Sequence, residues 1–280
     1  MEISVVISTR NRSEQLPQCI RSFYNITFAH PFEIVIVDNG STDNTPQLLI
    51  ELKNESPFPV KIVTEPVPGL GRARNMGWHA ASGRIIAFTD DDCYPAEDWL
   101  ANIHQCFQEN SISFLGGKIL LHDQSDWPMT IQLHDQREEF HPGSMIKTGM
   151  IQGANFSFLR EVLESVGGFD PKLGAGTPFG CEDVDILARL TAQGEHGAYD
   201  PRPVIYHHHG RKLHSEILIL LKGYEYARGA YYTKCLLNPL LRKRYIINWL
   251  QELKHQNIGL SVREILGGLH YLIHRWNPMS

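Results

Sequence analysis

Short apolar runs alternate with helix-like segments over the first 90 residues of the chain. The runs cover residues 3–8, 33–38, 60–63 and 84–89, and the helix-like segments cover residues 13–24, 42–54 and 71–81. Strands that are apolar along their whole length and alternate with helices are typical of a parallel sheet with helices on both faces. The chain is therefore predicted to have an α/β fold.

Polar and charged residues stand where three of these runs end. Arg10 follows the first run, Asp38 ends the second, and three consecutive aspartates at 90–92 follow the fourth. In a sheet of this kind, ligands bind outside the carboxyl ends of the strands. These positions therefore predict a binding site at one edge of the sheet.

The three aspartates suggest a metal. Adjacent carboxylates repel one another, and a hard divalent cation such as Mg²⁺ or Mn²⁺ relieves that repulsion. In an extended segment Asp90 and Asp92 point to the same side, so one can hold the metal while the other reaches a sugar or ribose hydroxyl. The alternative is an acidic turn in front of the next helix, which we expect near residues 96–99.

Other charged residues also have two interpretations. Asp38 can bind a nucleotide base or ribose, or it can simply form the turn with Asn39 and Gly40. Arginines near helix N-termini can bind a diphosphate, and otherwise they carry solvated surface charge. Arg72 and Arg74 stand at such a start, after the flexible residues 68–71.

Two further motifs carry possible chemistry. Glu182 and Asp183 follow a glycine-rich segment and begin a predicted helix, where one of them can act as a general base or both can simply favour the helix dipole. His207, His208 and His209 follow a strand-like run. They can supply a zinc pair, a single ligand that completes an oxygen-rich metal site, or ordinary structural histidines.

The charge is divided between two parts of the chain. Residues 1–209 carry 15 Lys and Arg against 27 Asp and Glu, a balance of −12, and residues 210–280 carry 11 against 4, a balance of +7. We expect a domain at 1–210 and a basic, helical extension at 211–280. Its predicted helices, 216–237 and an amphipathic one at 262–276, either pack on the body or on a second copy, or lie on a membrane surface.

Several classes of protein are disfavoured. Hydrophobic residues make up 42% of the chain, which argues against disorder, and no apolar run approaches the roughly 18 residues of a membrane span. The N-terminus is predicted to be a strand and not a signal peptide, and the five scattered cysteines fit a reducing compartment. We expect a cytoplasmic protein, peripheral on the inner face of the cell membrane if the tail binds there. The negative body disfavours nucleic acid as a partner.

Taken in order, these motifs have a specific resemblance. The segments SVVISTRNR, EIVIVDNGSTDNT, GLGRARNMGWHAASGRIIAFTDDDC, GGFD and CEDVDILARL are followed by a strand that ends in histidine. Across about residues 2–210 this order resembles a family-2 glycosyltransferase of the GT-A fold. The resemblance implies a Rossmann-like, nucleotide-binding mixed sheet flanked by helices, with the tail as a C-terminal extension. It also implies transfer of a sugar from a nucleoside diphosphate sugar, with inversion and a divalent metal.

The resemblance also implies roles for individual residues. Asp183 would be the catalytic base, and the metal would bind Asp92 and either His207 or His209. The residues in contact with the donor nucleotide would be Thr9, Arg10, Arg12, Asp38, Arg74, Asn75, Asp90 and Asp91. The acceptor side would include Glu182, Gly153, Asn155 and the segment 168–170. The third aspartate leaves open which of the carboxylates touch the metal.

The expected function is metal-dependent sugar transfer to a hydroxyl, with a UDP-sugar as the first choice of donor. The acceptor would be a sugar or a lipid-linked molecule, in polysaccharide or glycolipid synthesis, and self-association of the chain stays open. One alternative is a nucleotidyltransferase, although the chain lacks a glycine-rich, lysine-bearing loop near its N-terminus. Another is a non-catalytic scaffold that binds nucleotide sugars, which would have no physical need for so many uncompensated acids.

Overall fold

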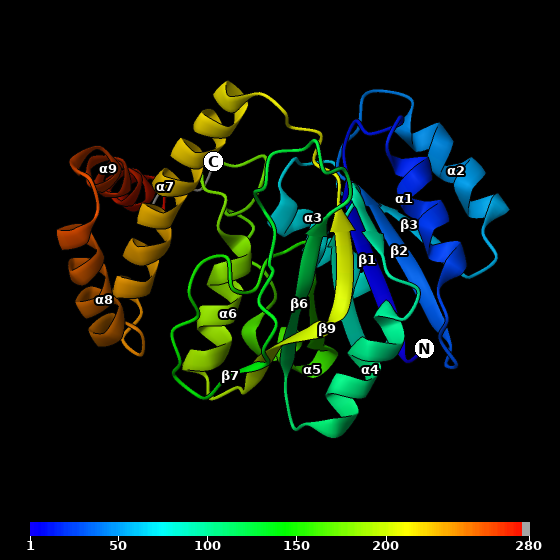
Figure 1. Ribbon diagram of the computed structural model, residues 1–280, viewed down its shortest axis with the longest axis horizontal. Coiled ribbons are helices and arrows are strands. Elements are labelled where there is room, and N and C mark those ends of the chain that lie inside the picture. The colour runs from blue at the N-terminus through cyan, green and yellow to red at the C-terminus, as the bar shows by residue number, and fades with distance from the viewer. Residues whose placement is uncertain (276–280) are drawn as a thin grey trace.

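A single curled sheet forms the centre of the computed structural model, which describes residues 1–275 (Figure 1). Its strands are β1 (Ile3–Thr9), β2 (Phe32–Asp38), β3 (Val60–Thr64), β4 (Ile85–Asp90), β5 (Cys93–Pro95), β6 (Phe114–Leu121), β7 (Glu138–Phe140), β8 (Phe156–Leu159) and β9 (Gly197–His207). The order across the sheet is β3-β2-β1-β4-β8-β6-β9-β5, and β7 pairs with β9.

The sheet changes direction between its two halves. The strands β3, β2, β1 and β4 are parallel, as the first four apolar runs predict. The strand β8 is antiparallel to both β4 and β6, while β6 and β9 are parallel. The result is the mixed sheet that the resemblance implies, and the carboxyl ends of β1, β2 and β4 share one edge.

Helices cover both faces of this sheet. They are α1 (Leu16–Ser22), α2 (Thr45–Glu55), α3 (Leu70–Ala80), α4 (Trp99–Glu109), α5 (Arg160–Val166) and α6 (Glu182–Ala192), with a short 3-10 turn η1 (Phe23–Asn25) after α1. The helices α1 and α2 begin three residues later than the sequence predicts. Each carries a proline in its first turn, where proline has no intrahelical hydrogen bond to lose.

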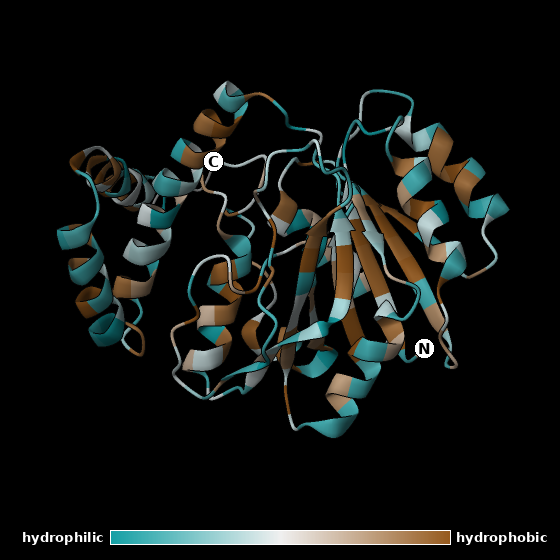
Figure 2. Cartoon of the chain, in the orientation of Figure 1, coloured by the Kyte–Doolittle hydropathy of each residue, from teal (hydrophilic) through white to brown (hydrophobic). Residues whose placement is uncertain are grey.

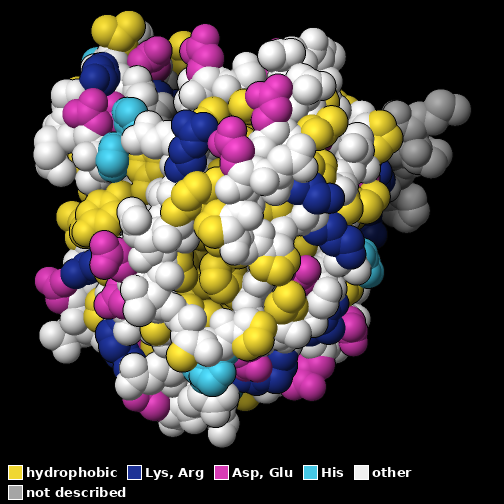
Figure 3. Space-filling model, turned by 90° about the vertical axis from the view of Figure 1, so that its right-hand side faces the viewer, with side chains coloured by type: hydrophobic (Ala, Val, Ile, Leu, Met, Phe, Trp, Pro, Cys, Tyr) yellow, Lys and Arg dark blue, Asp and Glu magenta, His cyan; other side chains and the backbone are white. Residues whose placement is uncertain are grey.

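The core has two layers because strand side chains alternate between the two faces. Val5 and Ile7 of β1 face the layer built with α1, α2 and α4, whereas Val6 faces the layer built with α3, α5 and α6. Figure 2 shows the same arrangement as hydrophobic strands between helices with hydrophilic outer surfaces. The side of the molecule that carries α2 and β3 presents hydrophobic side chains in its centre and charges of both signs around them (Figure 3).

The predicted extension forms α7 (His214–Leu237), α8 (Arg242–His255) and α9 (Ile258–His274). The middle of α7 packs on α6 and on the glycine-rich segment before it, with Tyr231 and Val184 in one buried cluster. The Lys234 ammonium also pairs with Asp170 Oδ2 at 2.6 Å and Asp185 Oδ1 at 2.7 Å. In the structure the tail thus packs on the body. Trp276, included in the predicted last helix, lies outside the described residues.

Glycines allow α7 and α9 to lie in close contact. A Cβ added at Gly267 would lie 1.9 Å from the Tyr226 carbonyl oxygen, and one added at Gly229 would lie 1.8 Å from the Glu264 carbonyl oxygen. The buried Glu264 carboxylate accepts hydrogen bonds from Trp249 Nε1 and Gln256 Nε2, both at 2.9 Å, and pairs with Arg228. Across residues 1–275, none of the helices has the length and hydropathy that a bilayer crossing requires.

Gly267→Ala should therefore separate α9 from α7. We expect a loss of about 1–3 kcal/mol of unfolding free energy, because the added methyl group overlaps backbone that cannot yield cheaply. The matched control is Gly259→Ala on the same helix, whose Cβ would meet its first neighbouring atom at 3.5 Å. Chemical unfolding followed by circular dichroism measures both variants. Equal stability of the two would contradict the close packing of these helices.

Candidate active site

A cavity of about 680 Å³ opens at the carboxyl ends of β1 and β4. The wall includes Thr9, Arg10, Arg12, Arg74, the aspartates at 90–92, Gly153, Glu182, Asp183 and His207, together with Arg211, Ile219, Leu220 and Tyr224 from the tail. The structure thus brings most of the predicted site residues together from segments far apart in the sequence.

The middle aspartate is held by the first strand. Thr9 Oγ1 donates a 2.6 Å hydrogen bond to Asp91 Oδ2, and the Arg12 guanidinium lies 3.8 Å from the other oxygen. Burial raises the pKa of the Asp91 carboxyl to about 7, against the lowering effect of the Thr9 hydroxyl. Asp91 therefore serves to tie the acidic turn to β1. Of the three carboxylates, that of Asp90 is the most exposed, at 34% against 10% for Asp91 and Asp92.

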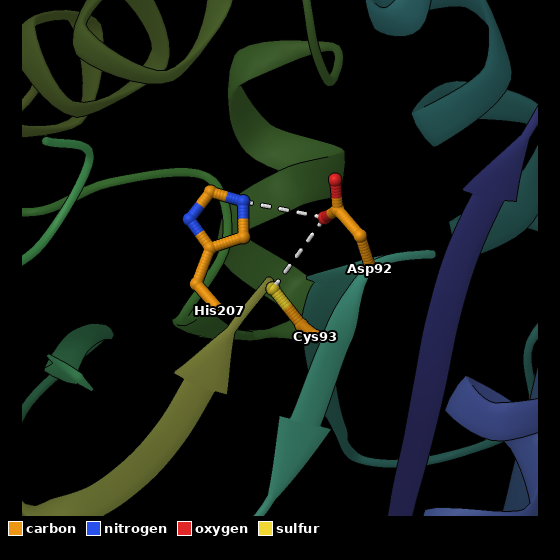
Figure 4. A group of neighbouring side chains, drawn as sticks. All are labelled: Asp92, Cys93 and His207. Carbon is orange, nitrogen blue, oxygen red and sulfur yellow. Dashed lines mark hydrogen bonds and ion pairs between the residues drawn. The ribbon is translucent and has the colours of Figure 1, made fainter. Parts of the chain in front are cut away.

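Asp92 and His207 form the candidate metal pair. His207 Nε2 lies 3.3 Å from Asp92 Oδ1, and the Cys93 sulfur lies beside the same oxygen (Figure 4). Burial alone would raise the pKa of Asp92, but the His207 hydrogen bond and nearby positive charges bring it below its usual value. The ligand atoms of the three side chains lie within 4.8 Å of one another, so they are close enough to share an ion.

The chemistry of this donor set fits a divalent cation. Burial raises the pKa of the Cys93 thiol well above its usual value, and a thiolate is not a ligand that hard cations prefer. A carboxylate and an imidazole remain, with Asp90 at the same wall of the cavity. Oxygen and nitrogen ligands of this kind suit Mn²⁺, and a carboxylate beside substrate phosphates suits Mg²⁺.

His209 does not share this position. Its Nε2 lies 3.0 Å from the Trp127 carbonyl oxygen, and its Nδ1 accepts a 3.0 Å hydrogen bond from the Arg211 backbone N–H. Both ring nitrogens are therefore engaged, and His209 is not part of the cavity wall. The sequence left His207 and His209 as equal candidates, and the geometry favours His207.

Arg74 joins three segments at the cavity wall. It projects from α3, donates from NH1 to Glu182 Oε1 at 2.7 Å and from NH2 to the Gly153 carbonyl at 3.2 Å, and lies 3.4 Å from Asp90 Oδ1. Its guanidinium carbon also lies 5.0 Å from the centre of the Phe156 ring. Burial raises the pKa of Glu182, which Arg74 opposes with its positive charge. In this structure Arg74 thus holds acids in place. The resemblance, by contrast, assigns Arg74 to nucleotide binding.

Asp183 is presented to the cavity from the first turn of α6. Its Oδ2 accepts a 3.2 Å hydrogen bond from the Gly153 N–H, and its Oδ1 accepts from the Val184 N–H at 2.7 Å. Gly153 also contacts Arg74 closely, since an added Cβ would lie 2.4 Å from a guanidinium nitrogen. The loop at 152–154 therefore positions both the carboxylate and the arginine at the cavity wall.

Two further predicted site residues, Asn75 and Asn155, also lie outside the cavity wall. Asn75 uses its side-chain amide to bind the backbone N–H and carbonyl of Phe169, both at 2.8 Å. Asn155 is buried and binds the Trp99 indole and the carbonyls of Lys118 and Pro203. Both amides are hydrogen-bonded to the protein itself, so in this structure they support loops around the cavity.

Asp38 lies near the cavity but does not line it. Its Oδ1 accepts a 2.9 Å hydrogen bond from the Ser41 N–H, which is the turn-forming role, and the carboxylate is buried. The next residue, Asn39, lines the cavity. Asp38 therefore lies at the border of the cavity and outside its wall.

The sequence interpretation missed the contribution of the tail. Arg211, Ile219 and Tyr224 line the cavity, although they belong to the segment expected to form a separate extension. Burial raises the pKa of Tyr224 to about 12, and the charges of Arg211 and Asp183 also act on it. Only the position of Arg211, two residues after His209, gave a signal, because the helix that follows carries no motif.

Comparisons with known proteins agree with this geometry. The family model described as "Glycosyl transferase family 2" matches residues 4–167. The chain belongs to this family. The glycosyltransferase AglE of Haloferax volcanii is 25% identical over 197 residues, which is 69% of this chain and 62% of that protein. An uncharacterised glycosyltransferase of a Nostoc species is 37% identical over 112 residues, which is 40% of this chain and 34% of that protein. The chain thus spans less than two thirds of either relative.

Solved structures share the fold. TarS 1–349 of S. aureus in complex with UDP-GlcNAc superposes with a TM-score of 0.65 at 19% identity, covering 88% of this chain and 69% of that one. The mannosyltransferase PcManGT of Pyrobaculum calidifontis, in complex with GDP-Man and Mn²⁺, has a TM-score of 0.65 at 18% identity, covering 99% and 81%. The architecture of this family-2 member is therefore the GT-A fold.

Arg74→Met should be strongly destabilising. It leaves the buried Glu182 carboxylate without its partner, and breaking a buried ion pair from one side costs about 3–5 kcal/mol. Replacing the acid as well, in Arg74→Met with Glu182→Gln, should recover part of that loss. Urea unfolding at neutral pH of Arg74→Met, Glu182→Gln and the double variant gives the coupling free energy between the two side chains. Additive losses would contradict the role of Arg74 as the partner of Glu182.

Proposed function

We propose that the chain transfers a sugar from a nucleoside diphosphate sugar to an acceptor hydroxyl, with inversion at the anomeric carbon and help from a divalent metal. The observation that carries this proposal is the common cavity of Asp183 and the strand-end aspartates. A carboxylate that can act as a base and acidic residues that can bind a metal thus share one cavity. This combination suits attack by a hydroxyl and departure of a diphosphate.

Asp183 is the proposed catalytic base. Its carboxylate is fixed by two backbone N–H groups and is open to the cavity, so it can accept the proton of an acceptor hydroxyl. The hydroxyl oxygen forms a bond to the anomeric carbon while the bond from that carbon to the diphosphate oxygen breaks. A single displacement of this kind inverts the configuration of the sugar.

Asp92 and His207 are the proposed metal-binding residues. A bound Mn²⁺ or Mg²⁺ would offset the negative charge that develops on the leaving diphosphate. Asp90 can reach a ribose or sugar hydroxyl, and Thr9, Arg10, Arg12 and Asp38 surround the same edge of the sheet. We propose a UDP-sugar as the donor, and support comes from TarS, which was solved with UDP-GlcNAc. GDP is the competing nucleotide, because PcManGT was solved with GDP-Man.

The setting we propose is polysaccharide or glycolipid synthesis at a membrane surface. Support comes from the positive balance of residues 210–280 and from apolar side chains of α9 that face outward, among them Ile258, Val262 and Ile273. Helices that combine such a face with nearby basic residues bind the interface of anionic membranes.

Asp183→Asn should lower turnover by about 10²–10⁴-fold, since the amide cannot take the proton. The matched control is Asp135→Asn, an exposed carboxylate outside the cavity wall. Release of the nucleoside diphosphate from a panel of nucleotide sugars measures transfer, and circular dichroism checks that each variant is folded. Wild-type turnover in Asp183→Asn would refute the assignment of the base. Release of pyrophosphate would instead identify a nucleotidyltransferase.

Nucleotide binding should depend on the metal. Thermal unfolding of the wild type with UDP or GDP should shift upward with Mn²⁺ or Mg²⁺ and return to its ligand-free value in EDTA, since a ligand at ~100 times its Kd adds about 2.7 kcal/mol. Asp92→Asn should abolish most of this shift, whereas Asp135→Asn should keep it. An undiminished shift in Asp92→Asn would move the metal site elsewhere, and no shift for any nucleotide would favour a scaffold.

A further inference from the structure

The first turns of α7 carry an apolar segment that the fold leaves uncovered. Residues 217–221 read Ile-Leu-Ile-Leu-Leu, and only Ile217 is buried. Leu218 is 43% exposed, Ile219 is 73% exposed and Leu221 is 43% exposed. Consecutive exposed apolar residues are unfavourable in water unless a ligand or partner covers them. We call residues 217–221 the apolar run.

The apolar run is continuous with the catalytic cavity. Ile219, Leu220, Gly223 and Tyr224 line the same cavity as Asp183, from the opposite side to the strand ends. These four residues follow the spacing of one helix face. In Figure 1 this end of α7 lies at the top of the view, beyond the part of the helix that α9 covers, and Figure 2 shows hydrophobic residues along it. A molecule whose polar end reaches Asp183 would therefore meet hydrocarbon as it leaves the cavity.

Positive charges border the apolar run on both sides. Arg211 lies in the cavity wall before the helix, and Lys222 follows the run and is exposed. Among the described residues, neither side chain has a carboxylate partner within ion-pair distance. Lys222 is three and four residues from Ile219 and Leu218, so it shares their face of the helix. The surface thus combines hydrocarbon with charges suited to a phosphate.

We infer that the acceptor is an amphiphile, in which the hydroxyl-bearing head is linked through a phosphate to a hydrocarbon chain. The head would lie at Asp183, the phosphate near Arg211 or Lys222, and the chain along the apolar run. This inference rests on the proposed function and specifies the acceptor side of the same cavity. It also gives a reason why a helix outside the segment matched by the family model enters the cavity wall.

Alkyl phosphates test the inference directly. Inorganic, butyl and octyl phosphate, each below its micelle concentration, are titrated into the full chain by calorimetry. We expect octyl phosphate to bind at least about tenfold more tightly than butyl phosphate, because each buried methylene contributes about 0.8 kcal/mol. The double variant Leu218→Ser with Ile219→Ser should lose that gain.

A matched variant controls for general hydrophobicity. Ile247→Ser with Leu250→Ser removes side chains of α8 that are 49% and 53% exposed and lie outside the cavity wall. This variant should bind octyl phosphate like the wild type. The inference is overturned if chain length has no effect, if both double variants lose binding equally, or if inorganic phosphate binds as tightly as octyl phosphate.

Two further measurements separate the remaining explanations. Sedimentation velocity tests whether the apolar run joins two copies of the chain. The inference is overturned if the wild type is a dimer, the Leu218→Ser with Ile219→Ser variant is a monomer, and the two bind octyl phosphate equally. The thermal shift with UDP or GDP and Mn²⁺ is recorded on the same samples. If the shift is present with UDP or with GDP and chain length has no effect, only the acceptor inference fails, whereas absence of a shift with both nucleotides in the wild type refutes the proposed function.

Discussion

One guanidinium group allows the acids of the candidate site to lie together. Without Arg74, the carboxylates of Asp90 and Glu182 would face each other across a buried space, with Asp183 next to them. The arginine reaches Glu182, 108 residues further along the chain, and so couples α3 to the first turn of α6. Gly153 completes the arrangement because no larger residue would leave room for the guanidinium. The position of Asp183 at the cavity thus depends on a contact made beside it.

Strand pairing also explains how the candidate metal-binding residues Asp92 and His207 come together. The short strand β5 pairs antiparallel with the end of β9, and Cys93 stands opposite His207 in that register. Asp92, one residue before Cys93, is thereby brought beside the imidazole. The pairing requires a strand of three residues directly after the acidic turn. Cys93 is the first residue of this strand, and its side chain is therefore buried. The predicted turn and metal interpretations of Asp90–Asp92 are therefore compatible: one turn ties Asp91 to Thr9 and leaves Asp92 to the histidine.

Local patterns in the sequence predicted the parallel half of the fold and the edge that carries the cavity. Apolar runs are a direct consequence of burial on both faces, and polar residues at strand ends are visible without knowing the pairing. The contacts of Asn75 and Asn155 were not predictable in this way, because each amide binds backbone groups that the fold brings from distant segments. The choice between His207 and His209 likewise depended on what surrounds each ring.

The tail shows why composition is a weak guide to domain boundaries. Its basic charge sets it apart from the acidic body, yet Lys234 binds Asp170 and Asp185 of that body, and Tyr224 reaches the cavity. The two parts pack together through a buried apolar cluster as well as through these ion pairs. The segment matched by the family model ends at residue 167, so the wall built by α7 lies outside what the matched segment covers. If the proposed function holds, the sheet edge would keep the donor and the metal while the tail would alter the acceptor side, because the two walls come from different parts of the chain.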